Sequence, residues 1–203
     1  MHKIGLTGGI CTGKTYILNI FDELGCYTVK ADDLAKKIIF SKGSEVYEIL
    51  KKKFGNEIFV GNEIDKGKFS KIIFANQEKR EFVNSLVHPL VAKEREKLYQ
   101  DIKETEQFPF FIYESSLLIE AQTYKDFEKI IVVYTSFEEQ VKRLMKRDDI
   151  SEEEAIEKIK AQIPIREKLK FADYTIDTSG DFEMTKSKTL EIFSLMKKSF
   201  NID

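Results

Sequence analysis

The sequence has few cysteines, no long apolar run and almost no excess of charge of either sign. Cysteine occurs twice in 203 residues, at Cys11 and Cys26. That pair is too sparse for a disulfide framework and lacks the spacing of a metal-ligand pattern, so we expect a reducing, cytoplasmic location. No uninterrupted apolar run approaches the roughly 20 residues that a membrane-spanning helix needs. No charged-then-apolar leader precedes the first strand-like segment, so we also expect no secretion.

The charges nearly cancel, with 33 basic and 35 acidic residues and a formal net charge of −2. Such a chain has no overall field that would attract nucleic acid or an anionic membrane. Any binding of phosphate must therefore be local. We expect small-molecule substrates as partners, without nucleic acid, membrane or an obligate protein partner.

Short apolar segments alternate with amphipathic ones along the chain, which predicts an α/β fold with a parallel sheet covered on both faces. The predicted strands are Lys3–Thr7, Tyr27–Val29, Phe108–Tyr113, Lys129–Tyr134 and Tyr174–Ile176. The predicted helical stretches are Tyr16–Leu24, Asp33–Phe40, about Glu45–Glu104, Phe137–Arg147, Ser151–Phe171 and Phe182–Phe200.

The spacing of these strands is uneven, because a long and almost wholly helical stretch separates the second from the third. This is too much chain for a simple crossover, so we predict an inserted helical region at about 33–104. A second charged helical block predicts a lid at about 141–171. The remaining core is then about 1–32, 105–140 and 172–203, all within one unit.

One motif carries the chemistry. It matches G-x-x-x-x-G-K-[ST] without a mismatch and lies between a predicted strand and a predicted helix, where a phosphate-binding P-loop must lie. Its residues are Gly8, Gly9, Ile10, Cys11, Thr12, Gly13, Lys14 and Thr15. Glycines let successive backbone N–H groups approach phosphate oxygens, and the following helix adds its positive end.

Two side chains of the motif have direct roles in this interpretation. Lys14 is expected to reach the β- and γ-phosphates of a bound nucleotide and to neutralise charge as the terminal phosphate transfers. The Thr15 hydroxyl is a hard oxygen ligand suited to Mg²⁺. A GTPase is the weaker alternative. Asp177–Gly180 matches the D-x-x-G pattern, but it follows the last strand, and the chain has no N-K-x-D element for reading guanine.

Further segments resemble the dephospho-CoA kinase family in their order and spacing over nearly the whole chain. They are the P-loop, A-D-D-L-A at 31–35, V-H-P-L-V at 87–91, S-L-L-I-E at 116–120, K-R-x-x-x-R-D-D at 142–149, Ala161-Gln162 and A-D-Y-T-I-D at 172–177. The resemblance implies a P-loop three-layer α/β sandwich with a five-stranded parallel sheet, a helical CoA-binding region and a lid. It also implies ATP-dependent phosphorylation of the ribose 3′-hydroxyl of dephospho-CoA, with Mg²⁺.

The resemblance assigns Asp32 to the catalytic base beside the acceptor ribose, where a carboxylate accepts or orients the hydroxyl proton. The alternative is that Asp32 or Asp33 only caps the following helix. The family usually has an aspartate where this chain has Lys30. Three interpretations of Lys30 stay open: it pairs with Asp32, it contacts a substrate phosphate, or it is an exposed lysine at the end of a strand. A further departure is Thr178, where the family usually has asparagine.

Two arginines lie four residues apart on one predicted helical face, so both can converge on a triphosphate. Arg143 and Arg147 are therefore predicted to bind ATP, and the resemblance favours Arg147 as the catalytic residue because it lies in the R-D-D segment. The alternative pairs them with nearby acids such as Glu139 and Asp148 on a solvated surface.

The remaining assignments are less specific. His88 and Glu120 match family positions in the acceptor region, and His88-Pro89 also reads as a helix boundary, with Pro89 opening the next helix. Cys11 lies near a helix N-terminus, which can lower a thiol pKa, so its modification is expected to block ATP binding. Two rivals stay open: another small-molecule kinase, of the nucleoside-monophosphate or shikimate type, and a module that binds ATP without catalysis.

Overall fold

The computed structural model describes residues 1–202, apart from the side chain of Phe74. The chain forms two compact units. The first contains Met1–Lys30 and the chain from Ile102 onward, and the second contains Ala31–Asp101. The first unit is therefore interrupted in sequence by the second. Each is described by itself below.

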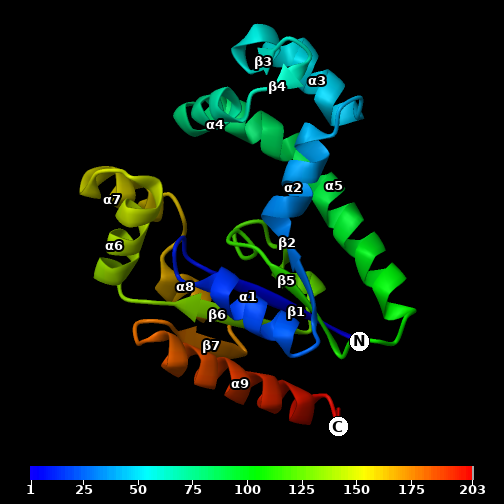
Figure 1. The fold of residues 1–203 in the computed structure, drawn as a ribbon, viewed down its shortest axis with the longest axis vertical. Helices are drawn as coiled ribbons and strands as arrows, with labels where there is room; N and C mark the ends of the chain where they lie inside the picture. Colours follow the sequence, from blue (N-terminus) through cyan, green and yellow to red (C-terminus); the bar gives the residue numbers. More distant parts are fainter. Residues whose placement is uncertain (203) are drawn as a thin grey trace. The chain divides into compact units, whose positions relative to one another are not determined.

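The first unit is built on a five-stranded sheet in the order β2-β5-β1-β6-β7, in which every neighbouring pair is parallel (Figure 1). The strands are β1 (His2–Gly8), β2 (Tyr27–Lys30), β5 (Phe110–Glu114), β6 (Lys129–Tyr134) and β7 (Tyr174–Asp177). The predicted strands and their parallel pairing are confirmed. β1 lies at the centre of the sheet, so the loop that follows it emerges from the middle of the carboxyl edge.

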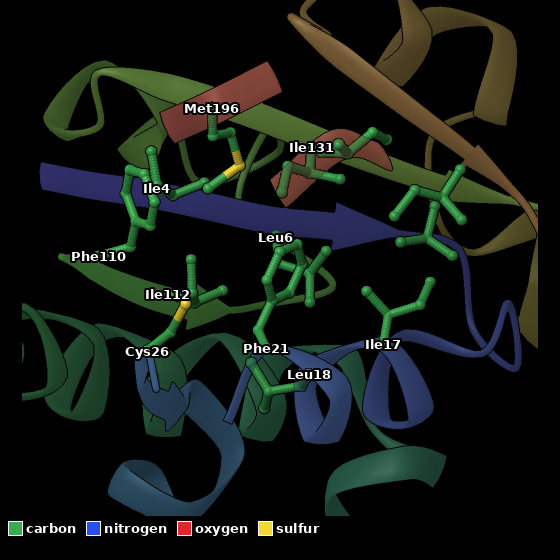
Figure 2. Close-up of a cluster of buried hydrophobic side chains, with 13 residues drawn as sticks. Ile4, Leu6, Ile17, Leu18, Phe21, Cys26, Phe110, Ile112, Ile131 and Met196 are labelled. Carbon is green, nitrogen blue, oxygen red and sulfur yellow. The ribbon is translucent and has the colours of Figure 1, made fainter. Parts of the chain in front are cut away.

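The helices of the first unit are α1 (Lys14–Glu23), α6 (Phe137–Asp148), α7 (Glu152–Lys160), α8 (Ile165–Leu169) and α9 (Phe182–Ser199), with a 3₁₀ turn at Thr123–Asp126. Two of them, α1 and α9, supply the buried cluster beside this sheet. Figure 2 shows α1 directing Ile17, Leu18 and Phe21 toward Ile4 and Leu6 of β1. Met196 of α9 joins the same buried cluster. This packing fixes where α1, and so the loop before it, begins.

The second unit is helical with one small hairpin. It contains α2 (Ala31–Phe40), α3 (Glu45–Phe54), a 3₁₀ turn (Gly55–Glu57), β3 (Phe59–Val60), β4 (Glu63–Ile64), α4 (Lys66–Ala75) and most of α5 (Gln77–Lys103). The expectation of helix throughout about Glu45–Glu104 is wrong at β3 and β4, which pair antiparallel. Gly61 and Asn62 form the turn between them, a pair of residues typical of tight hairpins.

Pro89 lies inside α5 and does not open a helix, so the predicted boundary at His88-Pro89 is wrong. A proline removes one backbone hydrogen bond of a helix, yet neighbouring packing can hold the helix together across it. The buried residues of α5 recur every four positions on both sides of Pro89: Val83, Val87, Val91, Arg95 and Tyr99. The packing of this continuous buried stripe outweighs the free energy lost with the backbone hydrogen bond that Pro89 cannot make. Within the described part of the chain, no helix has the length and apolar character required to cross a membrane.

Candidate active site

Residues 9–13 connect β1 to α1, and with Gly8, Lys14 and Thr15 they make up the predicted phosphate-binding motif. Gly13 precedes α1 with φ +88°, a left-handed conformation that glycine adopts without steric cost. α1 then begins directly at Lys14, so its first N–H groups face the loop. The strand-loop-helix context that the motif requires is present.

Lys14 is held against the loop that it serves. Its side chain is 7% exposed, and its Nζ donates a hydrogen bond of 2.7 Å to the carbonyl oxygen of Gly9. The same Nζ lies 3.9 Å from Glu114 Oε1. The ammonium is therefore desolvated and placed among loop carbonyls and one carboxylate, while the neighbouring Thr15 is exposed at the start of α1.

Glu114 is a site residue that the sequence reasoning missed. It ends β5, the strand next to β1, and its side chain is only 12% exposed. The signal was present, since an acid directly follows the apolar run that predicts the third strand. In register, Glu114 faces Lys30 at the end of β2. Lys30 therefore lies beside a carboxylate that itself approaches Lys14.

A cavity of about 420 Å³ opens beside the loop, on the side of α6 and the start of α9. Its lining includes Cys11, Gly13, Tyr16, Arg143, Thr178 and Phe182. The rings of Tyr16 and Phe182 meet edge to face at 5.0 Å. An aromatic wall, an arginine and a phosphate loop meeting at one cavity suit a nucleotide whose base lies beside its phosphates.

Arg143 is more firmly bound than a mobile surface arginine. Its Nη1 and Nη2 donate to the hydroxyl and carbonyl oxygens of Thr178, at 3.0 and 2.7 Å. Its Nε donates to Glu139 at 3.0 Å. The Thr178 hydroxyl also lies 2.9 Å from the carbonyl oxygen of Thr12. Arg143 thus connects α6 to the phosphate loop through Thr178, and its predicted contact with ATP stays a prediction.

Arg147 pairs with its sequence neighbour. Its Nε and Nη2 donate to the two carboxylate oxygens of Asp148 at 2.8 and 3.2 Å, and Lys158 of α7 donates to the same carboxylate at 3.0 Å. The hydrogen bonds from Arg147, with help from Lys158, lower the pKa of Asp148 to about 2. Both arginines therefore contact the acids that the alternative interpretation named. A catalytic role for Arg147 stays a prediction. It requires the Arg147 guanidinium to leave the Asp148 carboxylate and to contact a phosphate of the nucleotide instead.

Cys11 lies in the loop with φ +56°, which is unusual for a residue other than glycine. The thiol is partly buried, and this burial raises the pKa of Cys11 above its ordinary value although Arg147 lies nearby. Burial thus outweighs the lowering that a helix N-terminus can cause, and the expectation that modification of Cys11 blocks ATP binding stays a prediction. Desolvation disfavours the thiolate more than the nearby positive charges favour it.

The predicted acceptor residues Asp32 and His88 lie in the second unit. Asp32 is exposed in the first turn of α2, where an acid favours the helix dipole, and Asp33 lies beside it. His88 is exposed on α5. Their roles at an acceptor stay predictions.

Glu120 belongs to the loop after β5 in the first unit and is paired with a buried lysine. Lys168 of α8 has no exposed side-chain surface, and its Nζ lies 2.8 Å from Glu120 Oε1. The backbone N–H of Ile163 also donates to this oxygen, at 3.4 Å. Burial lowers the pKa of Lys168 below its ordinary value. The pair gives Glu120 a structural partner, and its predicted contact with the acceptor stays a prediction.

No group of three or more histidine, cysteine or acidic side chains in the described residues is arranged to hold a metal ion.

Comparison with known proteins extends these observations from one loop to the whole chain. The sequence model of a family described as dephospho-CoA kinase matches residues 2–183.

Curated relatives show the same likeness. The chain is 40% identical over 195 residues to a dephospho-CoA kinase of Aquifex aeolicus (strain VF5), covering 95% of this chain and 96% of that protein. It is 39% identical over 195 residues to a dephospho-CoA kinase of Carboxydothermus hydrogenoformans, covering 96% and 94%.

Solved structures agree with the sequences. A dephospho-CoA kinase from Campylobacter jejuni superimposes with a TM-score of 0.72 at 28% identity, covering 97% of this chain and 98% of the other. A shikimate kinase from Acinetobacter baumannii matches with a TM-score of 0.55 at 18% identity, covering 98% and 94%, which is a likeness of fold alone. A P-loop fold is thus common to several kinases. The sequence match to the dephospho-CoA kinase model runs from the first strand to the start of the last helix, and this chain belongs to the dephospho-CoA kinase family.

Proposed function

We propose that this chain transfers the γ-phosphate of ATP to the ribose 3′-hydroxyl of dephospho-CoA, giving coenzyme A. Its membership of the dephospho-CoA kinase family supports the reaction. The observation that carries the proposal is the buried Lys14 ammonium, which lies against the loop carbonyls and close to Glu114 at the centre of the sheet's carboxyl edge.

Phosphoryl transfer needs positioning and charge neutralisation more than covalent chemistry from the protein. Lys14 supplies a positive charge at the β- and γ-phosphates, and the N–H groups at the start of α1 bind the phosphate oxygens. The cavity beside Tyr16 and Arg143 accepts the adenosine part of ATP. Arg147 adds charge to the triphosphate when Asp148 releases it.

Asp32 is the proposed base for the acceptor hydroxyl. It comes two residues after the end of β2. Since the carboxyl ends of parallel strands lie along one edge of a sheet, the chain leaves β2 at the edge from which the phosphate loop emerges. His88 and Glu120 are proposed to contact dephospho-CoA.

The oxygen donors on this chain fit Mg²⁺. Thr15 offers a hydroxyl at the start of α1, and Glu114 offers a carboxylate at the end of the adjacent strand. Mg²⁺ keeps several waters and is commonly bound by one or two protein oxygens together with substrate phosphates. A bound Mg²⁺ supplies charge neutralisation on the β- and γ-phosphates.

The test is an acceptor panel. The protein is incubated with ATP, Mg²⁺ and separately with dephospho-CoA, a nucleoside monophosphate and shikimate, and each product is quantified. Transfer to dephospho-CoA alone is expected. Turnover of only another acceptor would establish a different small-molecule kinase.

Variants separate catalysis from binding. Lys14→Ala is expected to impair both ATP binding and transfer, while Asp32→Asn slows transfer and leaves ATP affinity unchanged. Asp33→Asn is the matched control, because it removes the neighbouring carboxylate from the same helical turn. Normal transfer by Asp32→Asn would remove the proposed base. Tight ATP binding without transfer to any acceptor would favour a non-catalytic module.

A further inference from the structure

Two glutamines hold one residue of the phosphate loop. Gln162 Oε1 accepts a hydrogen bond of 2.9 Å from the backbone N–H of Ile10, and Gln140 Nε2 donates one of 2.6 Å to the carbonyl oxygen of Ile10. Gln140 is 6% exposed on α6, and Gln162 follows the end of α7. The segment 137–162 is here called the α6–α7 segment. It is hydrogen-bonded to Ile10 near its beginning, through Gln140, and at its end, through Gln162.

The local sequence builds this segment as a unit. Ser136 caps α6 by accepting from the N–H of Glu139, and Ser151 and Glu154 form a reciprocal capping box at the start of α7. Figure 1 shows α6 and α7 packed side by side, in yellow. Their shared apolar cluster is completed by two loop side chains, those of Ile10 and Cys11. The cluster also contains Val141, Leu144, Ala155, Met145, Ile150, Ile156 and Ile159.

Gln140 and Gly9 are closely packed. A Cβ atom added to Gly9 would lie 2.6 Å from Gln140 Nε2, closer than real Cβ contacts allow. Gln140 therefore packs directly on the loop backbone, and a larger residue at position 9 would displace the Gln140 amide.

The peptide group that donates its N–H to Gln162 also accepts hydrogen bonds through its carbonyl oxygen. In a trans peptide the N–H and C=O groups point in opposite directions. The N–H of the Gly9–Ile10 peptide bonds to Gln162, and its C=O, that of Gly9, accepts from Lys14 Nζ at 2.7 Å and from Thr12 Oγ1 at 2.9 Å. One rigid peptide plane thus joins Gln162 to the lysine that binds phosphate.

We propose that Gln162 is a positioning residue that couples nucleotide binding to the α6–α7 segment through the Gly9–Ile10 peptide. This inference rests on the proposed ATP site. When a triphosphate draws Lys14 Nζ away from Gly9, the peptide loses its strongest donor on that side. Gln162 then keeps the peptide in place and the α6–α7 segment on the loop, with Gln140 as a second anchor.

This role predicts a specific defect. Without an acceptor at position 162, the α6–α7 segment leaves the loop more readily while ATP is bound, and water reaches the γ-phosphate. Phosphate transfer should fall and acceptor-independent ATP hydrolysis should rise relative to it. ADP lacks the γ-phosphate, so its affinity should change little.

Three variants test the proposal. Gln162→Met keeps the length of the side chain but removes the acceptor oxygen, and it should lower kcat by about tenfold, the scale of one lost hydrogen bond. Gln162→Glu keeps an acceptor oxygen, so it should restore the ratio of transfer to hydrolysis while its charge raises KM for ATP. Gln107→Met, at an exposed glutamine before β5, is the control and should match the wild type.

Hydrogen exchange gives a readout that needs no turnover. The Ile10 amide proton, followed by NMR with a non-hydrolysable ATP analogue, should exchange slowly in the wild type and in Gln162→Glu, and much faster in Gln162→Met. If the wild type makes no coenzyme A but keeps this protection of Ile10 with the analogue bound, the proposed acceptor is wrong and the coupling stands.

Other results would overturn the coupling. These are equal protection of Ile10 in all variants, an unchanged ratio of transfer to hydrolysis in Gln162→Met, or an equal loss of ADP and ATP affinity, which would indicate a disordered loop. Tighter ATP binding by Gln162→Met would also refute it, because the glutamine would then compete with the phosphate. If neither Gln162 variant folds, the wild-type measurement still tests the proposal, because fast exchange of the Ile10 amide with the analogue bound would refute it.

Discussion

Replacing Lys168 by methionine should destabilise the first unit strongly, because it breaks a buried ion pair. The Lys168 ammonium lies 2.8 Å from Glu120 Oε1 and donates to the carbonyl oxygen of Ser116 at 2.5 Å. Glu120 Oε2 is buried without a hydrogen-bond partner among the described residues. In Lys168→Met the carboxylate therefore keeps its desolvation cost and loses its cation.

The size of the effect follows from burial. Removing one partner of a buried pair typically costs about 3–5 kcal/mol. Lys168 is fully buried, but the Glu120 side chain is 19% exposed, so some water reaches the carboxylate. We therefore expect the lower end, about 3 kcal/mol in the free energy of unfolding. For a chain of this length that corresponds to a fall in Tm of about 6–12 °C.

A double-mutant cycle isolates the pair. Lys168→Met combined with Glu120→Gln leaves no uncompensated charge, so the double variant should recover more than half of the lost stability. Lys170→Met is the matched control. Lys170 pairs with Glu167 in the same segment but is 65% exposed, so its loss should cost less than about 0.5 kcal/mol.

Urea unfolding followed by circular dichroism measures the wild type, both single variants, the double variant and the control, since the chain has no tryptophan for fluorescence. A cost for Lys168→Met equal to that of Lys170→Met would refute the reasoning, as would a double variant no more stable than Lys168→Met. The same variants distinguish a structural role of Glu120 from a role in acceptor binding. The ion pair predicts that Glu120→Gln lowers Tm, whereas a contact with dephospho-CoA predicts a higher KM for the acceptor.

Four further predictions concern single residues. Cys11→Val should raise KM for ATP by about fivefold to thirtyfold while Cys11→Gly stays near the wild type, because a β-branched residue is strained at positive φ, at a cost of about 1–2 kcal/mol. Equal steady-state kinetics of the two variants would contradict this. Burial raises the pKa of Cys11, so alkylation by iodoacetamide at pH 7 should be slower than that of a free thiol and should accelerate as the pH rises. The pKa of Asp148 is lowered from 3.8 to about 2, so its stabilisation is present above pH 4 and is lost as the pH falls toward 2. The difference in unfolding free energy between the wild type and Asp148→Asn, about 1 kcal/mol at pH 6, should shrink over that range, and a difference that grows on acidification would refute the sign. Lys30→Asp should cost up to about 1 kcal/mol in urea unfolding, because it sets a second carboxylate beside Glu114, and Lys30→Gln should cost less.

The five strands of the sheet were predictable because each is a short apolar run bounded by polar residues, and the phosphate loop because its glycines and lysine have fixed spacing. The β3–β4 hairpin was missed since two-residue strands carry too little periodicity to outweigh the helical pattern around them. The interrupted helix expected at Pro89 was wrong because local propensity was weighed without the buried stripe that packs α5. Glu114 had a signal in the sequence, an acid closing an apolar strand, that was not used.

By itself the sequence determined the fold class, the phosphate loop and the family, because these depend on patterns that are local along the chain: hydrophobic periodicity, glycine spacing and the order of short motifs. Only the tertiary structure decided which side chains hold one another. Gln140 and Gln162 meet at Ile10, Lys168 meets Glu120 and Arg143 meets Thr178 across separations of 35 to 152 residues. The direction of the pKa shift of Cys11 was also a tertiary outcome, because desolvation depends on the helices packed around the thiol and not on its neighbours in sequence.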